Sequence, residues 1–142
     1  MNNTTPNIFE YKDRNFGDAQ GVVVTTSPEV FYPTSTTNLL LAAVRKHASP
    51  EAASALDLGC GCGIVAVALA KSILPQAKIY ASDISAEAVK LARRNAEENQ
   101  LAIDCRCGST FEPWNGVKFD LIVDDVAGMA EPIARRSSWY PP

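Results

Sequence analysis

The sequence predicts an α/β protein in which helices pack on a doubly wound parallel β-sheet. Two observations support this prediction. From residue 53 onward, short apolar runs of strand length alternate with longer helical patterns, and this alternation is typical of βαβ units. With 142 residues, of which 46% are hydrophobic, the chain is also long enough to bury the core of one such domain.

The N-terminal part precedes this alternation. Residues 1–20 are polar, and we expect them to form a loosely ordered segment. A β-branched run that ends in a proline, residues 21–28, predicts a short strand or one arm of a hairpin. Threonine and serine residues then precede an apolar stretch within residues 31–49, which predicts a capped helix that ends before Pro50.

Four strands and two helices are expected in the remainder of the chain. The first of these helices is apolar nearly all round, and the second begins at the capping residue Ser85 and has one apolar face. The strands are expected directly after Ala53 and at residues 77–83, 102–107 and 118–125, and the helices at residues 64–74 and 85–100. We therefore expect residues 21–142 to belong to one domain.

Charge and hydropathy exclude several classes of protein. The net charge of −3 argues against a general phosphate-binding surface, although a specific nucleic-acid substrate stays open. No run approaches the roughly 18 apolar residues of a membrane helix, and the first 20 residues are too polar for a signal peptide. We expect a cytoplasmic protein without a membrane partner.

The four cysteines form two Cys-x-Cys pairs, Cys60 with Cys62 and Cys105 with Cys107. Zinc sites usually space their cysteine ligands by two to four residues around a turn, whereas the second pair lies along an expected strand. Disulfides are rare in a reducing cytosol. We therefore expect neither a metal site nor a disulfide.

Glycines and polar residues follow the ends of the expected strands, where open parallel sheets bind their ligands. The first strand runs into Asp57 and three alternating glycines, which let the backbone turn tightly and approach a ligand closely. Asp83 ends the second strand, where an acid can accept hydrogen bonds from a ribose. The glycines are Gly59, Gly61 and Gly63, and the later strands are followed by Gly108-Ser109-Thr110-Phe111 and by Asp124-Asp125.

The glycine spacing separates two kinds of cofactor. A dinucleotide fingerprint requires G-x-G-x-x-G, but Ile64 stands where its third glycine would fall. The observed D-x-G-x-G-x-G instead resembles motif I of the class I S-adenosylmethionine-dependent methyltransferases. The stretches DLGCGCGIVAVALAK, ASDISAEAVKLARRNAEEN and FDLIV follow in the order and at the spacing of that family. FYPTSTTNLLLAAV resembles the helix that covers the cofactor in its small-domain and release-factor-type branches.

The resemblance implies a Rossmann-like fold, S-adenosylmethionine as the cofactor, and methyl transfer to a protein, an RNA or a small molecule. It also implies that Asp125, which would face both cofactor and acceptor, is the catalytic residue. The cofactor-binding residues that it implies are Asp57, Gly59, Cys60, Gly61, Gly63, Asp83, Ile84, Ser109 and Thr110. A non-catalytic S-adenosylmethionine-binding module and a nucleotide-binding oxidoreductase are the competing hypotheses, and the glycine spacing disfavours the oxidoreductase.

Structural roles compete with these assignments. The glycines could serve only a tight turn, Asp83 could merely cap the following helix, and Asp57 could hold the amides of the turn. His47, at the end of its helix, is expected to be a solvated or capping residue rather than a base. Trp114 and Trp139 are expected to be packing or loop residues, although Trp139 could line a substrate site.

The sequence departs from the family in two respects. Branches that modify planar nitrogens usually end the fourth strand with Asn-Pro-Pro-Tyr, whereas this chain has Asp125-Val126-Ala127-Gly128, which leaves the acceptor open. The family's sheet usually has seven strands, so we expect the C-terminal strands to be missing and the domain to be incomplete. In that case the exposed edge of the fourth strand would let isolated chains self-associate, unless a partner covers it.

Overall fold

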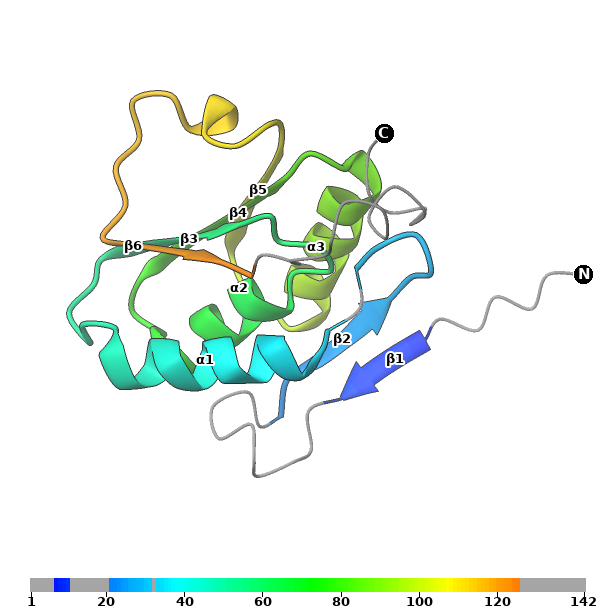
Figure 1. Ribbon diagram of the computed structural model, residues 1–142, viewed down its shortest axis with the longest axis horizontal. Helices are drawn as coiled ribbons and strands as arrows, with labels where there is room; N and C mark the ends of the chain where they lie inside the picture. The colour runs from blue at the N-terminus through cyan, green and yellow to red at the C-terminus, as the bar shows by residue number, and fades with distance from the viewer. Residues whose placement is uncertain (1–6, 11–20, 32, 126–142) are drawn as a thin grey trace, which may run out of the picture.

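The computed structural model of the protein describes residues 7–10, 21–31 and 33–125 (Figure 1). Its central sheet has four parallel strands in the order β5-β4-β3-β6. The strands are β3 (Ser54–Leu58), β4 (Lys78–Asp83), β5 (Ile103–Cys107) and β6 (Leu121–Asp124). The expected parallel α/β sheet is therefore confirmed.

Three helices connect or precede these strands: α1 (Ser35–His47), α2 (Ile64–Ala68) and α3 (Ala86–Glu98). The hydroxyl groups of Thr34 and Ser85 cap α1 and α3, as the sequence predicts. The helix predicted after the glycine turn is not regular throughout, because α2 continues as a π-helical turn, η2 (Leu69–Ile73). Among the described residues, no helix has the length and the apolar character needed to cross a membrane.

A separate antiparallel hairpin lies beside α3. It consists of β1 (Asn7–Glu10) and β2 (Val23–Thr26), so the predicted hairpin arm is confirmed. No strand is predicted within residues 1–20, because the four residues of β1, NIFE, do not alternate between apolar and polar side chains.

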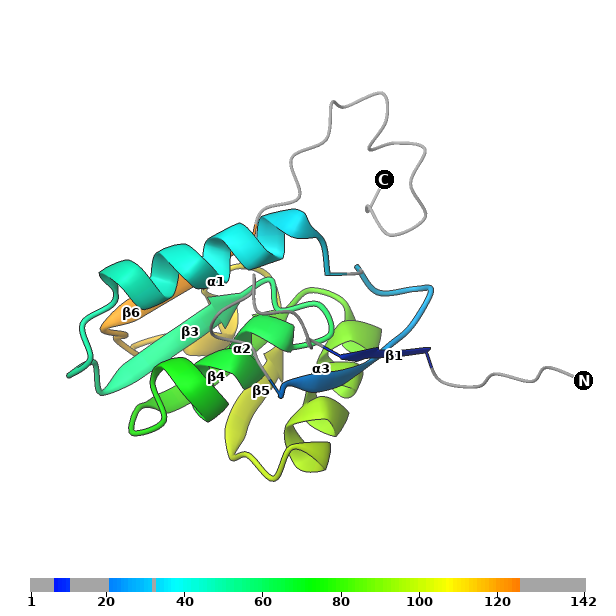
Figure 2. The same ribbon diagram turned by 90° about the horizontal axis from the view of Figure 1, so that it is seen from below.

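The central sheet has two faces that are covered differently. We call the first the helix face, because α1, α2 and α3 pack on it (Figure 2). Alternate residues of each strand point to this face and join the main hydrophobic core. They include Ala55, Ile79, Ala81 and Val123, and the buried carboxyl group of Asp57 lies on the same face.

The opposite face, here called the loop face, is covered by residues 108–120. This segment contains one 3-10 turn, η3 (Glu112–Trp114). The indole ring of Trp114 is 2% exposed and packs edge-on against Tyr80, with ring centroids 5.3 Å apart. Phe119 contacts both rings, so three aromatic side chains cover the loop-face side of β4.

Candidate functional site

The sheet changes its direction of growth at β3. From β3 the chain adds β4 and then β5 on one side, and it returns to place β6 on the other side. Open α/β sheets bind ligands at the carboxyl ends of the strands beside such a reversal. The strand register pairs Leu58 with both Ser82 and Asp124. The glycine turn after β3, the end of β4 and the loop after β6 therefore lie together.

Gly59 and Gly61 adopt backbone angles that favour glycine, with φ values of 71° and 53°. A Cβ atom on Gly59 would lie 3.5 Å from Asp124 Oδ1, and one on Gly61 would lie 3.7 Å from the carbonyl oxygen of Phe31. The two glycines therefore hold the turn close to the end of β6 and to the segment before α1.

Gly63 has a different role in the structure. It precedes α2 with a φ of 86°, and a Cβ atom there would lie 3.0 Å from the Cβ atom of Ala92 on α3. Gly63 therefore lets α2 and α3 pack closely, and it lines neither of the hollows described below. Its contact with a cofactor stays a prediction.

Asp83 holds the glycine turn from the end of β4. Its Oδ2 atom accepts a hydrogen bond from the N–H group of Gly61, and its Oδ1 atom accepts one from the N–H group of Ser85, both at 2.9 Å. Asp83 therefore contributes to the start of α3, which was the structural alternative. Each carboxylate oxygen retains a lone pair that can accept a hydrogen bond from a ligand.

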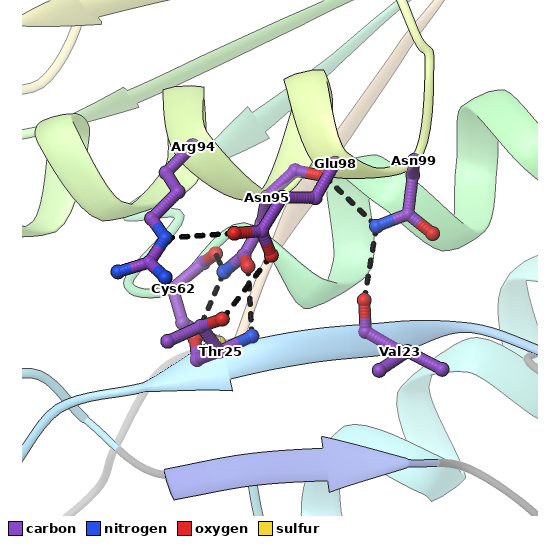
Figure 3. Close-up of polar contacts among 7 residues, drawn as sticks. All are labelled: Val23, Thr25, Cys62, Arg94, Asn95, Glu98 and Asn99. Carbon is purple, nitrogen blue, oxygen red and sulfur yellow. Dashed lines mark hydrogen bonds and ion pairs between the residues drawn. The ribbon is translucent and has the colours of Figure 1, made fainter. Parts of the chain in front are cut away.

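Asn95 fixes the other end of the turn from α3 (Figure 3). This fully buried side chain accepts a hydrogen bond from the N–H group of Thr25 at 2.7 Å and donates to the carbonyl oxygen of Thr25 at 2.9 Å. It also donates to the carbonyl oxygen of Cys62 at 2.8 Å. Beside it, Asn99 donates to the carbonyl oxygen of Val23. The two amides thus pair with the edge of β2 as a neighbouring strand would.

A small hollow lies between the glycine turn and the start of α1, with a volume of about 20 Å³. Asp57, Thr37 and Asp125 line it together with Phe31 and Pro33. The hydroxyl group of Thr37 donates a hydrogen bond of 2.8 Å to Asp125 Oδ2. The start of α1 is thereby joined to the end of β6. The small hollow has room for about one water molecule.

A large hollow of about 250 Å³ lies on the other side of Gly59, between the ends of β4, β5 and β6. Its lining includes both the polar carboxylate of Asp83 and the apolar side chain of Ile84, a residue that is 64% exposed. The residues that line it are Leu58, Gly59, Ser82, Asp83, Ile84, Gly108, Ser109, Thr110 and Asp124. Because Gly59 also lines the small hollow, the two hollows adjoin.

Four carboxyl groups surround the glycine turn, and no described residue that lines either hollow is basic. Burial raises the pKa of Asp57 to about 8, and the charges of Asp125, Asp83 and Asp124 add to this rise, against the lowering effect of a hydrogen bond from Ala66. This raised pKa favours the protonated form of Asp57 at neutral pH. Burial, and then the charge of Asp125, also raise the pKa of Asp124.

The cysteine of the turn has an unreactive environment. The Cys60 side chain is 6% exposed, and burial raises the pKa of its thiol well above the usual value. Its backbone N–H group donates to the carbonyl oxygen of Ser82 at 2.8 Å, so Cys60 connects the turn to β4. In the described part of the chain, no group of three or more His, Cys, Asp or Glu side chains could hold a metal ion.

The structure brings nearly all of the predicted site residues to the two hollows. Asp57, Gly59, Cys60, Gly61 and Asp125 line the small hollow, and Asp83, Ile84, Ser109 and Thr110 line the large one. Gly63 is the exception among the predicted residues. Trp114 is a buried packing residue and His47 is exposed in the last turn of α1, as expected. Trp139 lies outside the described residues.

Two residues that position parts of the site by hydrogen bonds, Thr37 and Asn95, were not predicted from the sequence. Thr37 was interpreted only as part of the predicted helix start, and no local pattern connects it with Asp125, which lies 88 positions away. Asn95 did carry a signal, because it lies in the apolar face of α3 between Leu91 and Ala96. A polar residue in such a face needs buried hydrogen-bond partners.

Comparisons with known proteins agree with this architecture. Residues 21–125 match the family described as methyltransferase small domain. The release factor glutamine methyltransferase of Geobacter sulfurreducens is 39% identical over 105 residues, which are 74% of this chain and 36% of that protein. The chain therefore spans about a third of the length of this curated relative.

Two solved structures have the same fold. A Pyrococcus abyssi tRNA (uracil-54, C5)-methyltransferase in complex with S-adenosyl-L-homocysteine is 28% identical, with a TM-score of 0.59 over 81% of this chain and 29% of that chain. The T. thermophilus 16S rRNA N2 G1207 methyltransferase, in complex with AdoMet and guanosine, is 22% identical, with a TM-score of 0.68 over 78% of this chain and 31% of that chain. The expected Rossmann-like fold is thus confirmed, and the chain belongs to the methyltransferase small domain family.

Proposed function

We propose that this chain is the cofactor-binding part of an S-adenosylmethionine-dependent methyltransferase that acts on a protein or an RNA. The observation that carries the proposal is the meeting of a glycine turn with four carboxyl groups at the reversal point of the sheet. The names of the relatives give the two acceptor classes, a protein release factor for one and RNA for the two solved structures.

The large hollow suits the nucleoside part of this cofactor. Asp83 can accept hydrogen bonds from the ribose hydroxyl groups, and the exposed side chain of Ile84 offers an apolar surface to the adenine ring. Ser109 and Thr110 add polar groups on the opposite side. Its volume of about 250 Å³ is close to the lower end of the range for small-molecule pockets.

The small hollow suits the charged amino-acid end. Asp57 and Asp125 are carboxyl groups without a basic partner among the described residues that line this hollow, and they can bind an ammonium group. Binding of a cation would favour the ionised form of Asp57. Because the small hollow holds about one water molecule, it must widen when the amino-acid end binds.

The reaction requires little acid-base chemistry from the chain. S-Adenosylmethionine supplies an activated methyl group, so the protein mainly orients the reactants and excludes water. Asp125, at the boundary between the small hollow and the loop after β6, is the proposed catalytic residue. Its carboxylate can accept a hydrogen bond from the N–H or O–H group of an acceptor.

Calorimetric titration with S-adenosylmethionine, S-adenosylhomocysteine and NAD tests the proposal. We expect the two sulfur compounds to bind and NAD not to bind. Asp83→Ala should weaken binding of the sulfur compounds by at least about 10-fold, because hydrogen bonds to a charged group contribute about 1.5–3 kcal/mol each. Asp104→Ala is the matched control, since this acid on β5 pairs with Arg106 away from both hollows.

Failure of the wild-type chain to bind either sulfur compound would contradict the proposal, as would equal binding by wild type and Asp83→Ala.

The proposal extends to residues 21–142 as the cofactor-binding domain and to a cytoplasmic location. All four cysteines are free thiols, which agrees with a reducing compartment.

Self-association through β6 is a further part of the proposal. Among the described strands, β6 pairs only with β3, so its outer edge offers backbone donors and acceptors to another chain. Ile122 on this strand is 46% exposed. Size-exclusion chromatography should show an apparent mass that rises with protein concentration, whereas a constant monomer with full cofactor affinity would contradict this part.

A further inference from the structure

Thr37 is fully buried, and its hydroxyl group is engaged on both sides. It accepts a hydrogen bond of 3.2 Å from the N–H group of Thr34, which closes the cap of α1. It donates a hydrogen bond of 2.8 Å to Asp125 Oδ2. The backbone group of Thr34 can only donate, so the single hydroxyl proton of Thr37 is committed to the carboxylate.

This hydrogen bond crosses the site rather than stabilising one element. Thr37 belongs to α1 and Asp125 follows β6, and both line the small hollow together with Asp57. A carboxylate that is held at one oxygen keeps its other oxygen available to accept from a ligand. The hydrogen bond therefore fixes where the second carboxyl group of the small hollow lies relative to the first.

We propose that Thr37 is a positioning residue, whose hydroxyl group holds Asp125 beside Asp57 so that the two carboxyl groups together receive the ammonium group of the cofactor. This inference rests on the proposed function. It assigns Thr37 to the amino-acid end of the ligand and not to the nucleoside end, because Thr37 does not line the large hollow.

The test compares two ligands that differ only in that end. S-Adenosylhomocysteine carries the amino-acid group, and 5′-methylthioadenosine has the same nucleoside without it. Calorimetry on the full chain should show that Thr37→Val weakens S-adenosylhomocysteine by about 10-fold and changes 5′-methylthioadenosine by less than about 2-fold. Thr37→Ser, which keeps the hydroxyl group, should restore the affinity for S-adenosylhomocysteine.

Further variants sharpen the result. Thr36→Val makes the same chemical change on the exposed side of α1 and should leave both affinities unchanged. Asp125→Asn should also weaken S-adenosylhomocysteine, and adding Thr37→Val to it should cause little further loss, because the two residues act through one hydrogen bond. Thr37→Ala replaces Thr37→Val if the valine variant does not fold.

The outcomes separate this inference from the proposed function. If the wild-type chain binds neither nucleoside, the proposed function fails and the inference fails with it. If wild type binds both but Thr37→Val weakens both equally, Thr37 has only a structural role and the inference alone is wrong. Tighter binding of S-adenosylhomocysteine by Thr37→Val would also overturn it, because the hydrogen bond would then keep the small hollow closed.

Discussion

On the helix face, buried hydrogen bonds to the backbone fix the position of the glycine turn, whereas on the loop face aromatic packing, together with a hydrogen bond from Trp114, supports the strand ends. Asn95 reaches the carbonyl oxygen of Cys62, and Asp57 accepts from the N–H group of Ala66. On the loop face, the indole N–H group of Trp114 donates to Ser82 Oγ at 2.9 Å.

This difference between the two faces corresponds to the difference between the charged end and the nucleoside part of the proposed ligand. The small hollow, which would receive the charged end, is bounded by groups whose positions are fixed by hydrogen bonds across several elements. The large hollow, which would receive the nucleoside, is more open and has an exposed apolar residue in Ile84. A charged group needs fixed partners to compensate for lost water, while an apolar ring tolerates some adjustment.

The strongest test of the comparison is Asn95→Ala. This change leaves two backbone groups of Thr25 and the carbonyl oxygen of Cys62 buried without partners, so we expect a loss of about 4 kcal/mol in the free energy of unfolding. Urea denaturation measures it. Asn99→Ala, which removes a partly exposed amide from the same edge of β2, should cost about 1 kcal/mol or less. Similar losses in the two variants would contradict the role of Asn95.

The second test uses two glycines that have similar φ angles and lie on different faces of the sheet. Gly63, with a φ of 86°, faces Ala92, whereas Gly116, with a φ of 79°, has no atom within 4 Å of an added Cβ. Gly63→Ala should cost about 3 kcal/mol in unfolding free energy from backbone strain plus overpacking. Gly116→Ala should cost about 1 kcal/mol from backbone strain alone. Equal losses would show that packing between α2 and α3 is not the reason for glycine at position 63.

Local patterns predicted most of the fold but only part of the site. Strand runs, Ser85 and the threonines before α1 act over a few neighbouring residues, so their structure could be read directly from the sequence. The contacts of Thr37 with Asp125 and of Asn95 with Thr25 join residues 88 and 70 positions apart, and no local pattern encodes them. The π-helical turn of η2 was missed because an apolar run fixes helix length but not hydrogen-bond spacing.

The third test addresses the loop face. Trp114→Phe removes the indole N–H group that donates to Ser82 Oγ and leaves unfilled volume beside Tyr80. We expect a loss of about 2 kcal/mol in unfolding free energy, from one hydrogen bond and a small cavity. Ser82→Ala removes the acceptor and keeps the ring, so it should cost about half as much. A loss for Trp114→Phe as large as that for Asn95→Ala would remove the distinction between the faces.

The last test is a pH dependence that separates Asp57 on the helix face from Asp124 on the loop face. Because the pKa of Asp57 is raised to about 8, the folded chain keeps a proton that the unfolded chain has released above about pH 4. This contribution to stability is present at low pH and is lost as the pH rises toward 8, with a slope of at most about 1.4 kcal/mol per pH unit.

Asp57→Asn should remove that slope, since the amide can still accept from Ala66 and carries no charge at any pH. Urea denaturation between pH 5 and pH 9 measures it. Asp124→Asn is the matched comparison: its pKa is also raised, but the side chain is exposed, so water screens the charge and the slope should change less. A larger change for Asp124→Asn than for Asp57→Asn would mean that the loop face, and not the helix face, carries the buried charge of the site.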